Sequence, residues 1–156
     1  MAKGYKRRYW RSGGKDKYSV EQAAGTVSTN EAGNGGVVIV PPTTLQGMRK
    51  VKHLTIQMCN FTGLASDVLY WALVYVPQGT SASTIAIDST SMYEPNQFVM
   101  GCGVFDFVGG PLRINCPLSR NLNSGDNISL IVFSTNGTAA TAANYGYVVK
   151  YAITLQ

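Results

Sequence analysis

The residues best suited to binding chemistry in this sequence are cations gathered at its N-terminus. Residues 1–17 contain seven of the 13 basic residues and one of the 8 acidic residues, so their formal charge is +6. The remaining chain holds six basic and seven acidic residues, a charge of −1. The seven cations are Lys3, Lys6, Arg7, Arg8, Arg11, Lys15 and Lys17. Because binding such cations releases counterions condensed on a polyanion, we predict a nucleic-acid-binding arm over residues 1–17, followed by a domain over residues 18–156.

Aromatic residues stand among these cations. Tyr5, Tyr9 and Trp10 offer ring faces on which unpaired bases stack without sequence preference, which favours single-stranded nucleic acid over a duplex. Glycines and mutual repulsion keep the arm from packing alone, so we expect it to be flexible when unbound. A solubilising tail and a basic nuclear-import signal are the alternatives, and the import signal is compatible with nucleic-acid binding.

A second basic cluster lies farther along the chain, at the start of an expected strand. It consists of Arg49, Lys50 and Lys52. If these side chains share a face with the root of the arm, they extend the nucleic-acid-binding surface. The alternative, a solvated strand end, stays equally open.

Residues able to catalyse a reaction are sparse. His53 is the single histidine, whereas a metal site on a β-sandwich needs several converging ligands. The serines lack a G-x-S-x-G setting. Five acids fall in or near expected loops without the pattern of a calcium loop and are expected to be solvated: Asp67, Asp88, Glu94, Asp106 and Asp126. We therefore predict no enzyme, no metal and no cofactor.

The three cysteines and the hydropathy bear on the compartment. Cys59, Cys102 and Cys116 have no C-x-x-C spacing and sit in apolar or alternating stretches, which predicts buried free thiols in a reducing environment. No stretch has the length and apolarity of a membrane span, and no signal-peptide run follows the basic N-terminus. We expect no membrane partner.

The elements that must position these residues are short strands separated by turn residues. The expected strands are 18–29, 37–40, 50–61, 68–76, 98–107, 112–116, 128–133 and 147–155. Residues 68–76 (VLYWALVYV) are apolar on both faces, which predicts a central strand. No apolar pattern has helical spacing, so the fold class is all-β, an antiparallel sandwich or barrel of about eight strands. These patterns leave a jelly roll and an immunoglobulin-like sandwich both open.

Five stretches, in order, carry a resemblance to a known family. They are residues 15–21 (KDKYSVE), 70–80 (YWALVYVPQGT), 92–97 (MYEPNQ), 119–126 (SRNLNSGD) and 151–156 (YAITLQ). With them, the chain resembles the capsid proteins of small circular, Rep-encoding single-stranded DNA viruses, the circovirus-like group.

This resemblance implies an eight-stranded jelly roll that assembles as a homo-oligomer into a small icosahedral shell, of the T=1 type, around single-stranded DNA, with the arm facing inward. It also implies a place in the virion and is compatible with assembly in the host nucleus. Charged residues make up 13% of the chain against about 25% in an average globular protein, which favours a body buried against neighbours.

The long Ser/Thr-rich connection over residues 78–96 is expected at a subunit contact or the outer surface. The residues predicted there are Ile85, Ile87, Met92, Tyr93, Glu94 and Asn96. The main alternative function is a non-capsid β-sandwich binding module, lectin-like or single-strand-binding. A third possibility is a hydrolase that uses His53 beside a nucleophile.

Overall fold

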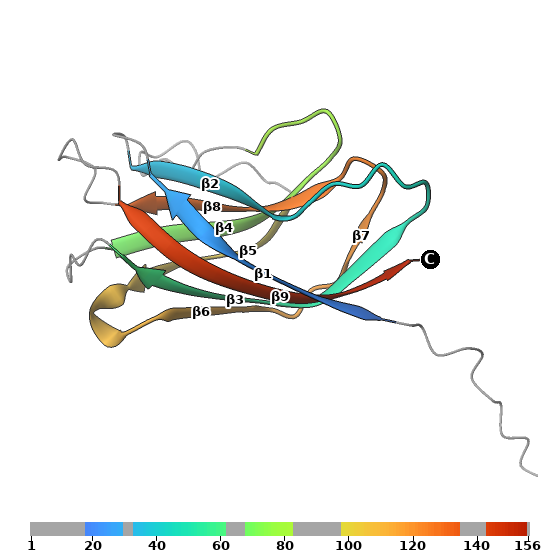
Figure 1. Cartoon of the computed structure of the whole chain (residues 1–156). Helices are drawn as coiled ribbons and strands as arrows, with labels where there is room; N and C mark the ends of the chain where they lie inside the picture. Colours follow the sequence, from blue (N-terminus) through green and yellow to red (C-terminus); the bar gives the residue numbers. More distant parts are fainter. Residues whose placement is uncertain (1–17, 30–32, 62–67, 83–97, 135–142, 156) are drawn as a thin grey trace, which may run out of the picture.

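The computed structural model describes residues 18–29, 33–61, 68–82, 98–134 and 143–155 (Figure 1). The seven cations and three aromatic residues of the arm lie outside these ranges, as do all six predicted contact residues between positions 85 and 96. Within the described residues, no helix is long and apolar enough to cross a membrane.

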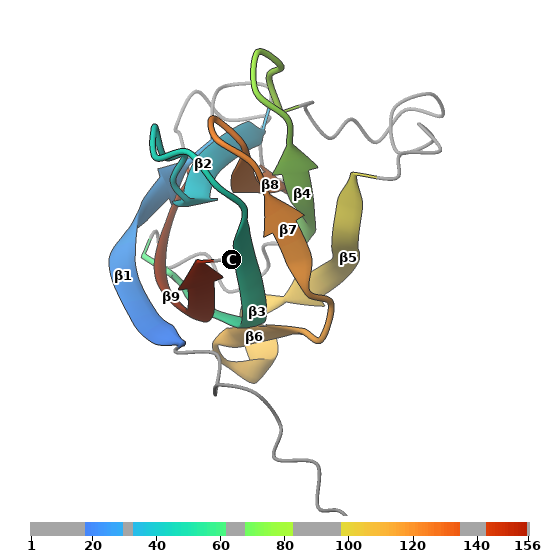
Figure 2. The same ribbon diagram turned by 90° about the vertical axis from the view of Figure 1, so that its right-hand side faces the viewer.

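Two antiparallel sheets face each other (Figures 1 and 2). The five-stranded sheet has the order β1-β9-β3-β6, with β7 also paired to β3, and the four-stranded sheet has the order β2-β8-β4-β5. The strands of the first are β1 (Ser19–Ser28), β9 (Asn144–Leu155), β3 (Arg49–Asn60), β6 (Leu112–Cys116) and β7 (Arg120–Leu122). Those of the second are β2 (Asn34–Val40), β8 (Asn127–Ser134), β4 (Val68–Val76) and β5 (Val99–Asp106), and a short 3₁₀ turn, η1 (Phe107–Gly109), follows β5.

Strands β6 and β7 behave as one interrupted edge strand. Both pair with β3, β7 along Arg49–Val51 and β6 along Leu54–Met58. Counting them together gives two sheets of four strands, and the chain crosses between the sheets after β1, β2, β3, β5, β7 and β8. This is an eight-stranded jelly roll, so the topology decides against the immunoglobulin-like alternative. Viral shells, lectin domains and cupins all use this architecture.

Strand β3 contains a β-bulge at His53, between the segment that pairs with β7 and the segment that pairs with β6. The register of β3 on β9 shifts between Lys52 and Thr55, and His53 has a φ of 54°, in the left-handed region. The bulge turns two consecutive side chains, Lys52 and His53, away from the core, while Val51 and Leu54 are buried. Burial alternates on both sides of the bulge, with Arg49 and Val51 buried before it and Leu54, Ile56 and Met58 buried after it.

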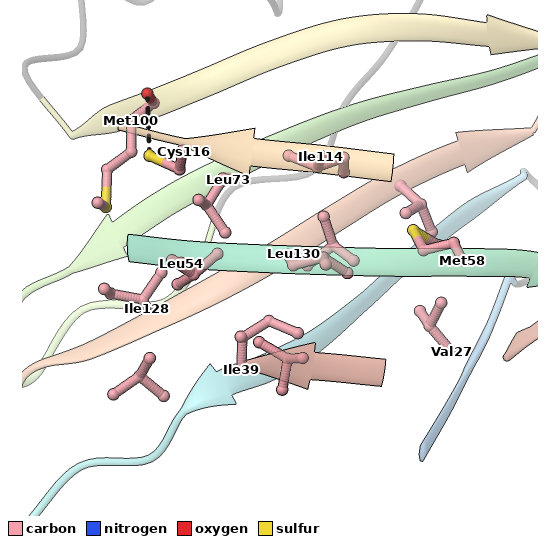
Figure 3. Close-up of a cluster of buried hydrophobic side chains, with 14 of the residues drawn as sticks. Val27, Ile39, Leu54, Met58, Leu73, Met100, Ile114, Cys116, Ile128 and Leu130 are labelled. Atoms are coloured by element: carbon pink, nitrogen blue, oxygen red, sulfur yellow. Dashed lines mark hydrogen bonds between the residues drawn. The ribbon is translucent and has the colours of Figure 1, made fainter. Parts of the chain in front are cut away.

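The core lies between the two sheets (Figure 3). Leu54, Ile56 and Met58 on β3 are fully buried, as their alternation predicted. Strand β4 has the predicted bounds, lies between β8 and β5, and packs on both faces. Strand β2 begins earlier than expected, at Asn34, because Gly35 allows a close approach: a Cβ there would lie 2.6 Å from the carbonyl oxygen of Ser28.

The prediction of buried cysteines is right for one residue of three. Cys116 is buried, and its Sγ donates to the carbonyl oxygen of Met100 (3.8 Å; Figure 3), whereas Cys59 and Cys102 are exposed. Cys59 takes an outward position in the alternation of β3. On β5 the register shifts opposite Leu73 and Val74. Cys102 therefore points outward, although in a regular strand it would lie on the same face as the buried Met100 two positions earlier.

Candidate nucleic-acid interface

Every cation outside the arm belongs to the five-stranded sheet. The strands of the four-stranded sheet contain no lysine or arginine. The six cations are Arg49, Lys50 and Lys52 on β3, Arg113 on β6, Arg120 on β7 and Lys150 on β9. Residues 1–17 lead directly into β1, the edge strand of this same sheet. The sequence places these cations up to 101 positions apart, so only the sheet order brings them together.

Strand register decides which of these cations share the outer face of the five-stranded sheet. On β9 the side chains of Val149 and Tyr151 are buried, so the exposed Lys150 between them points away from the core. Lys150 lies opposite Gln22 of β1 and Thr55 of β3. Gln57, the next outward-facing residue of β3 after Thr55, lies opposite the exposed Arg113 of β6. Two cations from different strands therefore flank β3 on one face.

A groove of about 510 Å³ runs over this outer face. Its polar lining includes His53, Thr55, Gln57, Arg113 and Lys150. None of the three acidic residues that the structure describes, Glu21, Asp106 and Asp126, is part of that lining. The groove therefore presents charge of one sign, which suits a polyanion.

The root of the arm meets the same face. Lys52 Nζ donates to Tyr18 Oη and lies 4.7 Å from the centroid of the Tyr18 ring. Tyr18 is the residue that immediately precedes β1 and the first described residue after the arm. The expectation that Lys50 and Lys52 share a face with the arm's root thus has a geometric basis at Lys52, while binding of nucleic acid there stays a prediction.

Arg49 has a different environment from its two neighbours in the predicted cluster. Only 8% of its surface is exposed, and Nη2 donates to the carbonyl oxygens of Pro41 (3.1 Å) and Asp126 (3.4 Å). Because an inward position in β3 directs the guanidinium under the β2–β3 connection, we leave Arg49 out of the nucleic-acid interface. Its contacts instead hold two loops to the end of the sheet.

Asp126 differs from the solvated turn acid that was expected. It is only 4% exposed, and its carboxylate accepts hydrogen bonds from Tyr75 Oη (2.6 Å), Asn123 N (2.8 Å) and Gln78 N (3.0 Å). Burial acts to raise the pKa of Asp126, but the three donors outweigh it, and the net pKa is lowered. Gly125, with a φ of 82°, allows the turn that directs this carboxylate inward.

Arg120 completes this buried cluster. Its guanidinium carbon lies 4.2 Å from the centroid of the Tyr75 ring, and burial together with Asp126 raises the pKa of the Tyr75 hydroxyl. The cluster joins the end of β4 to the turn before β8. It is a structural feature, because every polar group of Asp126 is already engaged by the chain itself.

Clusters of metal-binding side chains are not found in the part of the chain that the structure describes. No three His, Cys, Asp or Glu side chains gather there as ligands. His53 is exposed beside Lys150 and Arg113 in the groove, with no described carboxylate in the lining to orient it. Asp67, Asp88 and Glu94 lie outside the described residues.

Three residues of the outer face were not predicted: Arg113, Lys150 and Phe61. A local signal existed for Lys150, because a lysine between alternating apolar residues must face away from the core. Which strands flank it could not be read locally, since β3 and β9 are separated by most of the chain. The same long-range pairing places Arg113 on this face.

No protein-family model matches this chain, and no curated protein matches its sequence. Among solved structures, the chain is similar to one from Desmodium yellow mottle tymovirus, with 14% sequence identity and a TM-score of 0.41. The match covers 93% of this chain and 91% of that chain. At this TM-score the likeness carries no functional argument, and a function has to be argued from the residues of this chain.

Proposed function

We propose that this chain is a viral capsid protein that assembles into a small icosahedral shell and packages single-stranded DNA with the arm over residues 1–17. One observation carries the proposal: the outward-facing cations of the body, Lys50, Lys52, Arg113 and Lys150, all lie on the sheet that the arm enters, and the strands of the opposite sheet contain no lysine or arginine. Such a molecule has one face for a polyanion and other faces left for neighbouring subunits. Its place is then the virion, with the host nucleus as a site of assembly.

Subunit contacts are supported by apolar side chains that the monomer leaves exposed. Val99 and Val104 are exposed on β5, Val108 is exposed in η1, and Leu45 and Leu118 are exposed in connections between strands. Only 13% of the residues of the whole chain are charged, and eight of these lie in the arm, so the body has little of the solvated surface that keeps proteins apart. The contact residues predicted between positions 85 and 96 belong to this part of the proposal.

The test for assembly is electron microscopy and sedimentation of the full-length protein over a range of salt concentrations. We expect closed particles of uniform diameter. A species that stays monomeric under all conditions would overturn the proposed shell.

The test for packaging is the salt dependence of single-strand binding. If about six phosphates per chain are engaged, log affinity falls with log salt at a slope near −4. A variant with the seven arm cations replaced by glutamine should lose most of this slope. A slope near zero for the unaltered protein would overturn nucleic-acid packaging.

A second candidate function is a single-strand-binding module that forms no shell. The groove on the outer face of the five-stranded sheet favours it, because this groove exists within one chain. The two functions predict the same slope of log affinity against log salt, but only a capsid protein forms closed particles. Uniform closed particles decide for the capsid.

A further inference from the structure

Two adjoining grooves lie on the outer face of the five-stranded sheet. The first, of about 510 Å³, contains Arg113 and Lys150, and the second, of about 300 Å³, contains Phe61. They share Gln57 and Val148 in their linings, so they form one continuous surface along β3. Cations and an exposed aromatic ring therefore lie within one depression.

Phe61 is held against the sheet with much of its ring uncovered. Its backbone nitrogen donates to the carbonyl oxygen of Asn144 (2.9 Å), which fixes the residue at the end of β3 beside β9. Its ring covers Gly146, where a Cβ atom would lie 2.2 Å from Phe61 Cζ. The side chain is nevertheless 63% exposed. A phenylalanine ring that packs on a glycine and remains exposed to solvent can stack with another aromatic ring.

The outer face has an order along β3. Lys52 and Tyr18 meet near its start, at the root of the arm, and Phe61 directly follows its end. Lys150 and Arg113 lie between them on the flanking strands. Nine residues of strand span about 30 Å. Cations with an aromatic residue at either end therefore follow a single line that begins where the arm joins the body.

Charge and shape select the occupant of this face. The cations have no described carboxylate beside them, because Glu21 of β1 lies opposite the buried Tyr151 and so faces the other side of its strand. A second copy of the same face would bring like charges together and is disfavoured. A duplex keeps its bases stacked inside, whereas the bases of a single strand are free to stack on Phe61.

We infer that the outer face of the five-stranded sheet is a second binding site for single-stranded nucleic acid, in addition to the arm. Phosphates lie over Lys52, Lys150 and Arg113, and a base stacks on Phe61. The inference deepens the proposed function and rests on it, since it gives the packaged strand a path from the arm across the body.

The experiment measures anisotropy of a labelled oligothymidine of about 20 nucleotides, long enough for one site, against salt concentration, with the full-length protein. The double variant R113Q/K150Q removes two phosphate contacts, so the slope of log affinity against log salt should become shallower by about 1.4. R113K/K150R, which keeps both charges, should restore it. The control V38E/Q46E lowers the net charge equally but at exposed positions of β2 and of the β2–β3 connection, away from the groove and from the proposed subunit contacts, and should keep the slope.

Phe61→Ala tests the base contact separately. We expect at least about a fivefold loss of affinity for the single strand, with an unchanged salt slope and unchanged binding to a duplex of equal length. An equal loss on duplex, or no loss on the single strand, would overturn stacking on Phe61. Thermal unfolding of each variant establishes that the body remains folded.

The outcomes separate the inference from the proposed function. If R113Q/K150Q binds like V38E/Q46E while neutralising the arm abolishes binding, the second site is wrong and the packaging arm stands. If neutralising the arm also leaves the binding unchanged, both the second site and packaging by the arm are wrong. If R113Q/K150Q alone makes the slope shallower, the sheet face is a binding site.

Discussion

The hydroxyl of Tyr75 donates a hydrogen bond of 2.6 Å to Oδ2 of Asp126, joining the end of β4 to the turn before β8. The same carboxylate accepts the backbone N–H groups of Asn123 and Gln78. These bonds close the end of the sandwich where the β2–β3 connection also arrives, since Gly125 N donates to the carbonyl oxygen of Thr43 (2.9 Å). A turn that looked solvated in the sequence is a junction of three connections.

Replacing Asp126 by asparagine should lower the free energy of unfolding by about 3 kcal/mol. The buried carboxylate loses its charge-assisted hydrogen bonds, and the side-chain NH₂ group of the asparagine faces a hydrogen-bond donor that the carboxylate oxygen had accepted from. Urea denaturation measures the change. Asp106→Asn is the matched control: this carboxylate is exposed and accepts a hydrogen bond from Val108 N, so the cost should stay below about 1 kcal/mol. Equal effects at the two positions would contradict the role given to Asp126.

The Tyr75–Asp126 bond makes stability depend on pH at both ends of the scale. Because the folded pKa of Asp126 lies below its ordinary 3.8, its contribution is complete above that value and is lost as pH falls through the folded pKa. The folded pKa of Tyr75 lies above its ordinary 10.0, so its contribution is complete below pH 10.0 and is lost as pH rises through the folded pKa.

Urea midpoints measured between acid and alkali test this dependence. The loss of stability in acid should be smaller for Asp126→Asn than for the unaltered protein, and Tyr75→Phe should flatten the alkaline limb. Unchanged limbs in both variants would show that other groups control the pH dependence.

Gly103→Ala should destabilise the domain by about 1–3 kcal/mol. A Cβ at this position would lie 3.0 Å from Trp71 Cζ2, because the indole lies over the glycines of β5. Gly36→Ala is the matched control on β2, where the nearest atom, the carbonyl oxygen of Leu130, is 3.8 Å away. Thermal unfolding compares them. A larger cost at Gly36 would mean that Trp71 has room to move.

A thiol reagent should distinguish the cysteines of the folded, dissociated protein. Cys59 and Cys102 are exposed and should react at once, whereas Cys116 is buried and should react only after unfolding. Absorbance of the released chromophore counts the thiols. Serine variants of Cys59 and Cys102 assign the two fast reactions, and a fast reaction that survives both substitutions would contradict the burial of Cys116.

Strand content was readable from the sequence because it depends on local patterns. The run over residues 68–76 is apolar on both faces and bounded by a proline, and the structure has β4 at the same bounds with packing on both sides. The alternation of Leu54, Ile56 and Met58 likewise identified the buried face of β3. Strand β7 (Arg120–Leu122) was not predicted, because three residues are too few for an alternation to be recognised.

Bulges and turns account for the errors. The register shift in β5 inverts the alternation for Cys102, whereas the bulge at His53 leaves the predicted burial of Leu54, Ile56 and Met58 unchanged. The glycines of the strand over residues 98–107 favoured close packing or a bulge, in agreement with the shift beside Gly101, whereas nothing in the types of the residues beside His53 marks the bulge there. Asp126 was misjudged because a turn acid is usually solvated, and its burial depends on donors from Tyr75 and Gln78, about 50 residues earlier in the chain.

The sequence by itself determined the all-β class, the charge of the arm and the alternation that directs Lys150 outward. It did so because side chains of a strand alternate with a period of two, whatever the strand pairs with. Only the tertiary structure decided that the six cations of the body share one sheet, that Arg49 is buried, and that Arg113, Lys150 and Phe61 border two adjoining grooves on one face. Sheet order and register come from pairing between distant segments, and local residue types do not encode them.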